Sequence, residues 1–407
     1  MEKNTMKIAI IVREYHRKGG ISKVVVEIAE RMANLGYEVH IFTGNYDKIE
    51  NTKVIFHKIP IIKGVVFNKL GLYKISKFLQ GISFCIISKF YLKYDIFDIV
   101  HVNGDTLAKF DIRMAHSCHK AWLKLANKNL KGPFDWIKKN LNPHHWRILI
   151  TEKFNFTKGN YKKIIAISEI TKQEIIENYN VPFGDIVVVP LGVDLNKFNP
   201  EHKKLYRSEI RNKYNISEEE IVLLFVGYDF HRKGLEFVIK AISRLKNQDI
   251  KLLVVGRDKV WPYINLAKKI NVIDKIIFVG AQNEINKFYS ASDIFVFPTI
   301  YEPFGLVVIE AMASGLPVIV SKIAGSAEII TDSKDGMLIG DPKNVEEISE
   351  KLYFLIKNKE LREEIGKNAR ITAENFSWDK ITDRIINVYK EVLKNKNENL
   401  YSFKKHS

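Results

Sequence analysis

Two glutamates, Glu302 and Glu310, are separated by seven residues in a segment that is otherwise mostly apolar or small. An apolar run before them is expected to form a strand ending at Pro298, and a helix is expected to begin near Gly305. The first N–H groups of a helix have no partner within it and lie at the positive end of its dipole, so they suit a pyrophosphate. A carboxylate beside such a site can accept hydrogen bonds from sugar hydroxyls. The simpler alternative is a capped helix with two incidental glutamates.

A basic pair with matching chemistry, Arg232 and Lys233, lies in the loop 228–234 between an expected strand and an expected helix. The planar fork of Arg and the point charge of Lys can neutralise a diphosphate without a metal ion. This matters where a nucleoside diphosphate departs, because its negative charge grows in the transition state. The alternative is a pair of solvated side chains at a helix start. The sequence has no Asp-x-Asp between a strand and a loop to bind a metal, so we expect no metal and no other cofactor.

A glycine pair in the first half, Gly19 and Gly20, links the first expected strand to the first expected helix. Glycines there permit close approach of the backbone to donor phosphates or to an acceptor, although such a pair is more often only a turn. They do not form the G-x-G-x-x-G pattern, so a nicotinamide oxidoreductase is poorly supported.

Further polar candidates follow two other strands of the first half. His116 stands directly after one of them, and Asp105 is a weaker candidate for contact with an acceptor. The alternative for His116, Cys118 and His119 is a zinc site. Their spacing matches no usual structural zinc pattern, and no second Cys–His cluster follows. We therefore expect no metal site, with His119 as an ordinary polar neighbour.

Apolar, β-branched runs alternate with helical stretches along nearly the whole chain, which predicts parallel sheets covered on both faces. The turn-rich segment 190–200 interrupts the alternation and predicts a linker. We expect two doubly wound α/β domains, 1–190 and 191–377, with ligands at the carboxyl ends of their strands in a cleft between them. An amphipathic helix should begin at Trp378 and fray after Asn395. The expected strands are 7–12, 37–43, 99–102, 112–115, 164–167, 185–189, 221–226, 251–255, 275–279, 293–297 and 317–320.

The charge of the chain is unevenly distributed. The formal net charge is +17, and residues 51–165 contain 21 Lys or Arg and 6 Asp or Glu, which gives this stretch +15. A basic block inside one half indicates a directional surface rather than a uniformly basic protein.

Two cysteines in 407 residues suit a reducing compartment, and the start of the chain reads as a short strand rather than a secretory signal. The sequence therefore predicts a cytoplasmic protein.

The basic block mixes lysines with apolar and aromatic residues over 61–94 and 119–156, and Trp122, Phe134, Trp136 and Trp146 lie in the second stretch. Interfacial helices have this composition, because apolar side chains enter the headgroup boundary while lysines meet anionic phosphate. The interpretation is a peripheral protein at an anionic membrane surface. The alternative is a solvated basic face over an ordinary core.

The pattern formed by Glu302 and Glu310 resembles the E-x7-E signature of retaining GT-B glycosyltransferases of the family 4 type. The resemblance covers nearly the whole chain, and within that group the sequence is most similar to lipopolysaccharide core glucosyltransferases. The similarity is carried by the segments 227–234 and 255–259 and by the basic segment after Ala115. It implies a GT-B fold of two Rossmann-like domains facing across a cleft. The helix 378–395 would cross back to the first domain.

The same resemblance implies roles for single residues. Glu302 would contact the donor sugar, Glu310 the ribose, and the backbone of Gly305, Leu306 and Val307 the phosphates. His116 would face the reacting sugar and stabilise positive charge at its anomeric carbon. The acceptor hydroxyl would attack on the face from which the diphosphate leaves, so Glu302 and His116 count as catalytic without being nucleophiles. UDP-glucose is the first expectation for the donor, with other UDP sugars and GDP-mannose as alternatives, and a glycan or lipid-linked glycan is the expected acceptor.

Three other classes of protein remain as alternatives. A sugar-nucleotide epimerase on the same fold would release free nucleoside diphosphate without an acceptor. A non-catalytic sugar-nucleotide-binding subunit would keep the fold, although the complete set of Glu302, Arg232 and Lys233 argues against lost activity. A nucleic-acid-binding protein would explain the charge, but the basic block contains no recognised binding module, so no nucleic-acid partner is expected.

Overall fold

The chain divides into two compact units in the computed structural model, which describes residues 5–17, 19–47, 52–62, 73–128, 132, 136, 139–245 and 248–405. Unit 1 comprises Met1–Val189 and Ile381–Ser407, and unit 2 comprises Pro190–Lys380. This division falls at the start of the turn-rich segment 190–200, where the hydrophobic periodicity of the sequence is interrupted.

The described part of unit 1 is built on a parallel sheet with the strand order β5-β3-β1-β6-β7-β8-β9. All its strands run in one direction, so their carboxyl ends meet at one edge. A separate short ladder joins β2 (Glu14–Tyr15) to β4 (Asn45–Tyr46). The strands of the main sheet are β1 (Lys7–Val12), β3 (Glu38–Thr43), β5 (Ile55–Lys58), β6 (Ile99–Asn103), β7 (Ile112–Ala115), β8 (Lys163–Ala166) and β9 (Ile186–Val188).

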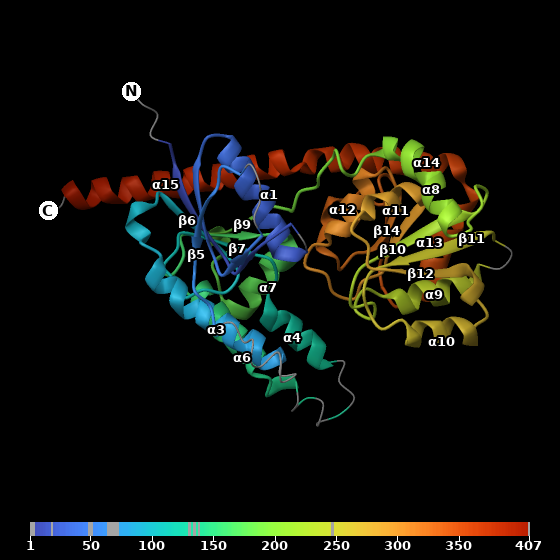
Figure 1. The fold of residues 1–407 in the computed structure, drawn as a ribbon, viewed down its shortest axis with the longest axis horizontal. Helices are drawn as coiled ribbons and strands as arrows, with labels where there is room; N and C mark the ends of the chain where they lie inside the picture. Colours follow the sequence, from blue (N-terminus) through green and yellow to red (C-terminus); the bar gives the residue numbers. More distant parts are fainter. Residues whose placement is uncertain are drawn as a thin grey trace. The chain divides into compact units, whose positions relative to one another are not determined.

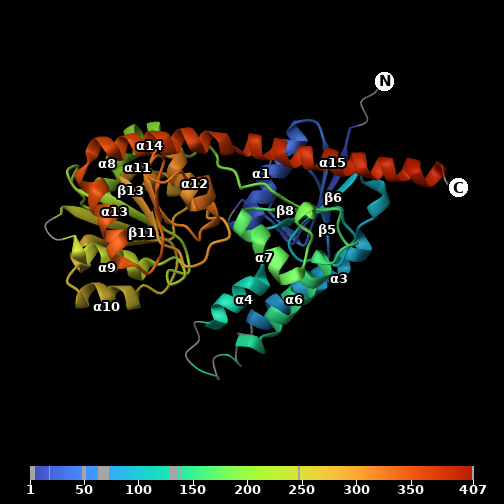
Figure 2. The ribbon, with the colours of Figure 1, turned by 180° about the vertical axis from the view of Figure 1, so that it is seen from behind.

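Helices cover both faces of this sheet (Figure 1). Along β6, Val100 and Val102 join the apolar core that contains Phe84 of α3 and Phe156 of α6. His101, between them in sequence, points to the other face, where its Nδ1 lies 2.5 Å from the hydroxyl of Tyr389 in the C-terminal helix α15. Figure 2 shows α15 from behind, on the side of unit 1 opposite to α3 and α6. The helices are α1 (Gly20–Asn34), α3 (Tyr73–Tyr91), α4 (His119–Lys128), α6 (Pro143–Phe156), α7 (Glu169–Tyr179) and α15 (Trp378–Lys405).

Unit 2 has a parallel sheet with the order β12-β11-β10-β13-β14-β15. One face packs on α9, α10 and α13 through a core that includes Phe225, Val238 and Leu352. Its strands are β10 (Ile221–Val226), β11 (Ile250–Val255), β12 (Ile276–Gly280), β13 (Ile294–Phe297), β14 (Val318–Ser321) and β15 (Met337–Ile339). Its helices are α8 (Lys203–Lys213), α9 (Leu235–Arg244), α10 (Trp261–Lys269), α11 (Ile285–Ala291), α12 (Leu306–Ala313), α13 (Val345–Lys357) and α14 (Lys359–Ala373).

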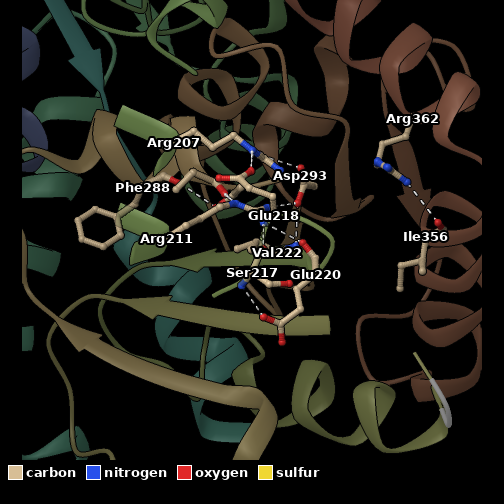
Figure 3. A network of polar contacts seen from close by, with 12 residues as sticks. Arg207, Arg211, Ser217, Glu218, Glu220, Val222, Phe288, Asp293, Ile356 and Arg362 are labelled. Atoms are coloured by element: carbon tan, nitrogen blue, oxygen red, sulfur yellow. Dashed lines mark hydrogen bonds and ion pairs between the residues drawn. The ribbon is translucent and has the colours of Figure 1, made fainter. Parts of the chain in front are cut away.

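A buried polar network fixes the amino edge of the unit 2 sheet (Figure 3). Asp293, just before β13, accepts hydrogen bonds from Arg207 and Arg211 of α8 at 3.0 and 2.7 Å, and from the N–H of Val222 in β10 at 2.8 Å. Arg211 is fully buried and also donates to the carbonyls of Ser217 and Glu220. Each charged group therefore has close partners, as burial of charge requires.

The fold differs from the sequence predictions in its short strands, which include the unpredicted β2 and β4, and in the length of its last helix. The edge strands β5 and β15 were not predicted, because Ile55–Lys58 is only partly buried and Met337–Ile339 is three residues long. Helix α15 continues to Lys405 and does not fray after Asn395. The predicted strand limits are otherwise within two residues of those in the structure. Among the helices of the described residues, none has both the length and the apolarity that a membrane span needs.

Candidate functional site

The loops at the carboxyl ends of β10, β11 and β13 pack against one another without room for side chains. A Cβ on Gly256, after β11, would lie 1.6 Å from the carbonyl oxygen of Gly227. A Cβ on Gly234, which has φ of 81° and precedes α9, would lie 2.0 Å from the carbonyl oxygen of Pro298. Only glycine fits these positions, so the chain can bring three strand ends together at one place.

Glu302 forms an ion pair with Lys233 at this place. Lys233 is buried, and its ammonium lies 4.9 Å from the centre of the Phe297 ring. Arg232 approaches the same Glu302 carboxylate at 3.7 Å and donates to the carbonyl of Tyr301 at 2.7 Å and to Asp229 at 2.9 Å. Burial lowers the pKa of Lys233, and the charge of Arg232 lowers it further. The structure thus unites three of the predicted site residues.

Helix α12 begins beside this ion pair. Gly305 is its N-cap with φ of 100°, and no side chain among the described residues caps the first turn, which contains Leu306 and Val307. A Cβ on Gly305 would lie 3.1 Å from Cγ of Glu302 and 3.2 Å from Oγ of Ser326. Ser326 is buried, and its hydroxyl has no hydrogen-bond partner within the described residues. The site therefore combines a helix N-terminus, an unpaired hydroxyl and two cations, which together suit phosphate oxygens.

Glu310 lies deeper in the unit than Glu302. Its side chain is 6% exposed, and the hydroxyl of Tyr289 in α11 lies 3.3 Å from its carboxylate and 3.1 Å from the carbonyl oxygen of Val307. Burial, followed by the Glu310 charge, raises the pKa of Tyr289 well above its ordinary value. Tyr289 therefore stays protonated at neutral pH, and its one hydroxyl proton can be donated to Glu310 or to Val307.

Four other predicted residues belong to unit 1, at the carboxyl edge of its own sheet. Gly19 and Gly20 adopt φ of 74° and 37° at the start of α1, and a Cβ on either would meet no atom of the described residues within 4 Å. The pair therefore makes the turn into α1 and leaves open space beside it.

His116, directly after β7, is held by Asn103 at the end of β6, with 3.0 Å between Nε2 and the amide oxygen. Desolvation, followed by the nearby charge of Arg113, lowers the pKa of His116 to about 3. The side chain is therefore neutral at physiological pH. A neutral imidazole can orient a polar group beside it, and it gains charge only at a cost.

Asp105 follows β6 and is ion-paired with the buried Arg147 of α6 at 2.7 Å. The neighbouring α4 and α6 carry stacked rings, in which His119 contacts Trp122 and its Nε2 lies 3.0 Å from Nδ1 of His145. His119 and His116 thus have separate partners, and Cys118 is directed to the carbonyl of Glu174. Within the described residues, no three His, Cys, Asp or Glu side chains are grouped to hold a metal ion.

The low pKa of His116 has a measurable effect on stability. The unfolded chain takes up a proton near pH 6.5, whereas the folded chain does so only near pH 3, so acidification below pH 6.5 favours unfolding. We expect His116→Gln to lose less stability than the unmodified protein between pH 6.5 and 4.5. The internal reference is the free energy of urea unfolding at pH 7.5, where His116 is neutral in both the folded and the unfolded chain. If the unfolding free energies of the two proteins depend on pH in the same way, the low pKa of His116 in the folded protein is contradicted.

Family models match both halves of the chain. The model described as "Glycosyl transferases group 1" matches residues 206–372, and the model described as "Glycosyltransferase Family 4" matches residues 18–197. The two matches together show that the protein is a glycosyltransferase. The first of these matches covers all the predicted donor-site residues of unit 2.

This glycosyltransferase has relatives in archaea and bacteria. It is 27% identical to an uncharacterized glycosyltransferase of Methanocaldococcus jannaschii over 95% of this chain and 98% of that protein. It is 29% identical to the lipopolysaccharide glucosyltransferase WaaG of Escherichia coli over 55% of this chain and 60% of that protein.

Solved structures show the fold of this glycosyltransferase. The crystal structure of WaaG matches with a TM-score of 0.76 and 22% identity over 94% of this chain and 99% of that one. Anabaena HepE in complex with UDP and glucose matches with a TM-score of 0.66 and 16% identity, over 95% of this chain and 99% of that one. The predicted GT-B fold, and the predicted resemblance to lipopolysaccharide core glucosyltransferases, are confirmed.

Four residues of the glycosyltransferase contact the predicted site and were not predicted: Asn103, Arg147, Tyr289 and Ser326. Tyr289 and Arg147 lie within helices, where the sequence shows only amphipathic spacing. Asn103 could have been found, because it is a polar residue at the end of an apolar strand. Ser326 gave a similar signal, since it follows a glycine shortly after β14.

Proposed function

We propose that this glycosyltransferase moves a hexose, with glucose as the first candidate, from a nucleotide sugar to a glycan or lipid-linked glycan, with retention of configuration. The observation that carries the proposal is the ion pair of Glu302 and Lys233 beside the uncapped N-terminus of α12. WaaG is named a glucosyltransferase, and HepE was crystallised with UDP and glucose, which supports a UDP-glucose donor.

The donor half of the reaction follows from the charges at this place. The first turn of α12, with Arg232 and Lys233, would stabilise the charge that gathers on the leaving diphosphate. Glu302 would accept hydrogen bonds from sugar hydroxyls, and Glu310 would bind the ribose. The pairing of Glu302 with Lys233 makes it a poor nucleophile, which favours attack by the acceptor on the leaving-group face. Catalysis then rests on placement and charge stabilisation, and it uses no resident metal.

The acceptor half would lie in unit 1. Gly19 and Gly20 leave room beside α1, and Asp105 with Arg147 offers polar contacts to hydroxyls. The neutral His116 would orient the donor sugar and stabilise positive charge at its anomeric carbon.

The test of this function has three measurements on the full chain. Thermal shifts with UDP, GDP and ADP identify the base, because a ligand that binds the folded state raises its stability. Transfer from radiolabelled UDP-glucose to lipid-linked glycans, with NMR of the product linkage, tests the reaction and its retention. Excess EDTA should leave the rate unchanged. Release of free nucleoside diphosphate without any acceptor-dependent product would instead indicate the epimerase.

We further propose that the acceptor is presented at the inner face of the cytoplasmic membrane and that α3 and α6 bind this surface. Ile86 and Phe90 of α3, and Trp146 and Ile150 of α6, are exposed pairs spaced by four residues, so each pair shares one helix face. Exposed lysines, among them Lys89 and Lys153, accompany them. Each base near an anionic surface contributes about 1 kcal/mol. Lys63, Lys69 and Phe134 belong to the stretches predicted to bind the membrane, and they lie outside the described residues.

Binding to anionic vesicles tests this surface. The double change Trp146→Ser, Ile150→Ser should lower the partition coefficient at least about tenfold, because two apolar side chains no longer enter the interface. Leu205→Ser is the control, since Leu205 is equally exposed but lies on α8 of unit 2. Co-sedimentation at low and high salt gives the partition. Equal binding of both variants, or failure of the active protein to bind at low salt, would exclude the proposed surface.

A further inference from the structure

Unit 1 contains a cavity of about 430 Å³ between the sheet and α15, and no role in the proposed reaction involves it. Its wall from α15 includes Glu391, Val392, Asn395 and Lys396. Its other lining residues are Tyr94, Lys109, Lys162, Lys163 and Asp185.

The cavity lies at the edge of the sheet remote from the predicted acceptor residues. Ile112 and Lys163 are the first residues of β7 and β8, and Lys109 and Lys162 stand just before them. His116 follows the last residue of β7. Because the strands are parallel, their amino ends mark the opposite edge from the site described above.

The carboxylates at the cavity already have cationic partners. Asp111, which is fully buried beneath Tyr94, accepts a hydrogen bond from its hydroxyl and is ion-paired with Lys396 at 2.9 Å. Glu391 is paired with Lys163 at 2.9 Å. The remaining acid of the lining, Asp185, is paired with Lys158 at 2.5 Å. The negative charge around the cavity is therefore compensated.

Two cations are left over. Lys109 and Lys162 have no ion-pair partner within the described part of the chain, and both are exposed at the cavity. Lys109 lies 4.1 Å from the centre of the Tyr94 ring, and Lys396 lies 5.2 Å from the same centre. Like charges gathered around one ring repel each other, and an anion between them would relieve this repulsion.

We propose that this cavity binds a phosphate group. Two uncompensated ammonium groups match the charge of a phosphate dianion, and lysine binds phosphate as a point charge. Lys396 belongs to α15, whereas Lys109 and Lys162 belong to the sheet side of the cavity. A bound phosphate therefore holds α15 against the sheet of unit 1, and its binding is coupled to the stability of that packing. The phosphate belongs to a soluble phosphorylated metabolite or to a lipid headgroup.

Titration calorimetry of the full chain with inorganic phosphate, at constant ionic strength, tests the site. We expect Lys109→Met, Lys162→Met to bind at least tenfold more weakly than the unmodified protein. The charge-retaining double change Lys109→Arg, Lys162→Arg should bind normally. The control is Lys58→Met, Lys268→Met, which removes two exposed lysines elsewhere that have no ion pair with any residue the structure describes. Phosphate bound at the donor site is common to all variants. If circular dichroism shows that the double methionine variant is misfolded, the single variants Lys109→Met and Lys162→Met replace it in the calorimetry.

Vesicles that contain phosphatidic acid separate the two sources of phosphate. Loss of phosphate binding with unchanged vesicle binding identifies a soluble phosphorylated ligand. Weakened vesicle binding by the Lys109 and Lys162 variant, relative to its control, identifies a lipid headgroup. If that variant and its control bind both probes equally, the proposed site is wrong.

Discussion

Replacing Glu302 by Gln, or Lys233 by Met, is expected to slow sugar transfer by at least about a hundredfold, the scale of one charge-stabilising contact in a transition state. Each change also breaks a mostly buried ion pair, and removal of one partner from such a pair costs about 3–5 kcal/mol. Activity and stability therefore fall together in the single variants, and activity alone does not separate a site residue from a structural one.

The double change Lys233→Met, Glu302→Gln separates the two effects. Since it leaves no buried charge unpaired, we expect it to recover most of the lost unfolding free energy and none of the lost activity. The matched control is Lys240→Met, Glu236→Gln, an exposed ion pair on α9 of the same unit, which should leave transfer unchanged. Recovery of activity in the double variant would show that the pair serves only the fold. Urea unfolding and initial rates are measured on the same samples.

Gly305→Ala should abolish nearly all transfer, by at least about a hundredfold. The new Cβ would lie 3.1 Å from Cγ of Glu302, tighter than ordinary contact, so the carboxylate must shift. The methyl group would also stand at the start of α12, where the backbone N–H groups are proposed to meet phosphate. Loss of close approach and displacement of Glu302 both act on the transition state.

Gly280→Ala is the matched control for this change. Gly280 has φ of 78°, against 100° for Gly305, but a Cβ on it would meet nothing within 4 Å. Both variants carry the cost of a positive φ, roughly 1–2 kcal/mol, and only Gly305→Ala adds the crowding of Glu302 to it. Only Gly305→Ala should lose nucleotide affinity and transfer. Equal activity of the two variants would remove α12 from the proposed donor site.

Local signals in the sequence were sufficient to predict most of the fold. Strands such as Ile221–Val226 are continuous apolar runs, and such runs are typical of parallel sheets buried on both faces. At the start of α7, Ser168 accepts a hydrogen bond from the N–H of Thr171, which is the local N-cap interaction that serine favours. The edge strand β5 gave no such signal because its residues are exposed or only partly buried, and β15 gave none because it is only three residues long.

The candidate site was predictable where its residues directly follow the ends of strands. Arg232, Lys233 and Glu302 follow strand ends, so parallel topology alone brings them to one edge. Their partners are different. Tyr289 approaches Glu310 from another helix, and Arg147 approaches Asp105 across 42 residues of sequence. Such pairs depend on how helices pack, and periodicity does not specify which side chains meet.

The assignment of α15 to unit 1 has a consequence for synthesis on the ribosome. Tyr389 and Ile385 are buried in unit 1, yet they are translated only after the whole of unit 2, Pro190–Lys380. At about 5–20 residues per second the delay is roughly 10–40 s, during which His101 and the sheet face around it lack their cover. The unit that is made first is therefore the last to be completed. A nascent chain paused within unit 2 would present an open apolar face to chaperones.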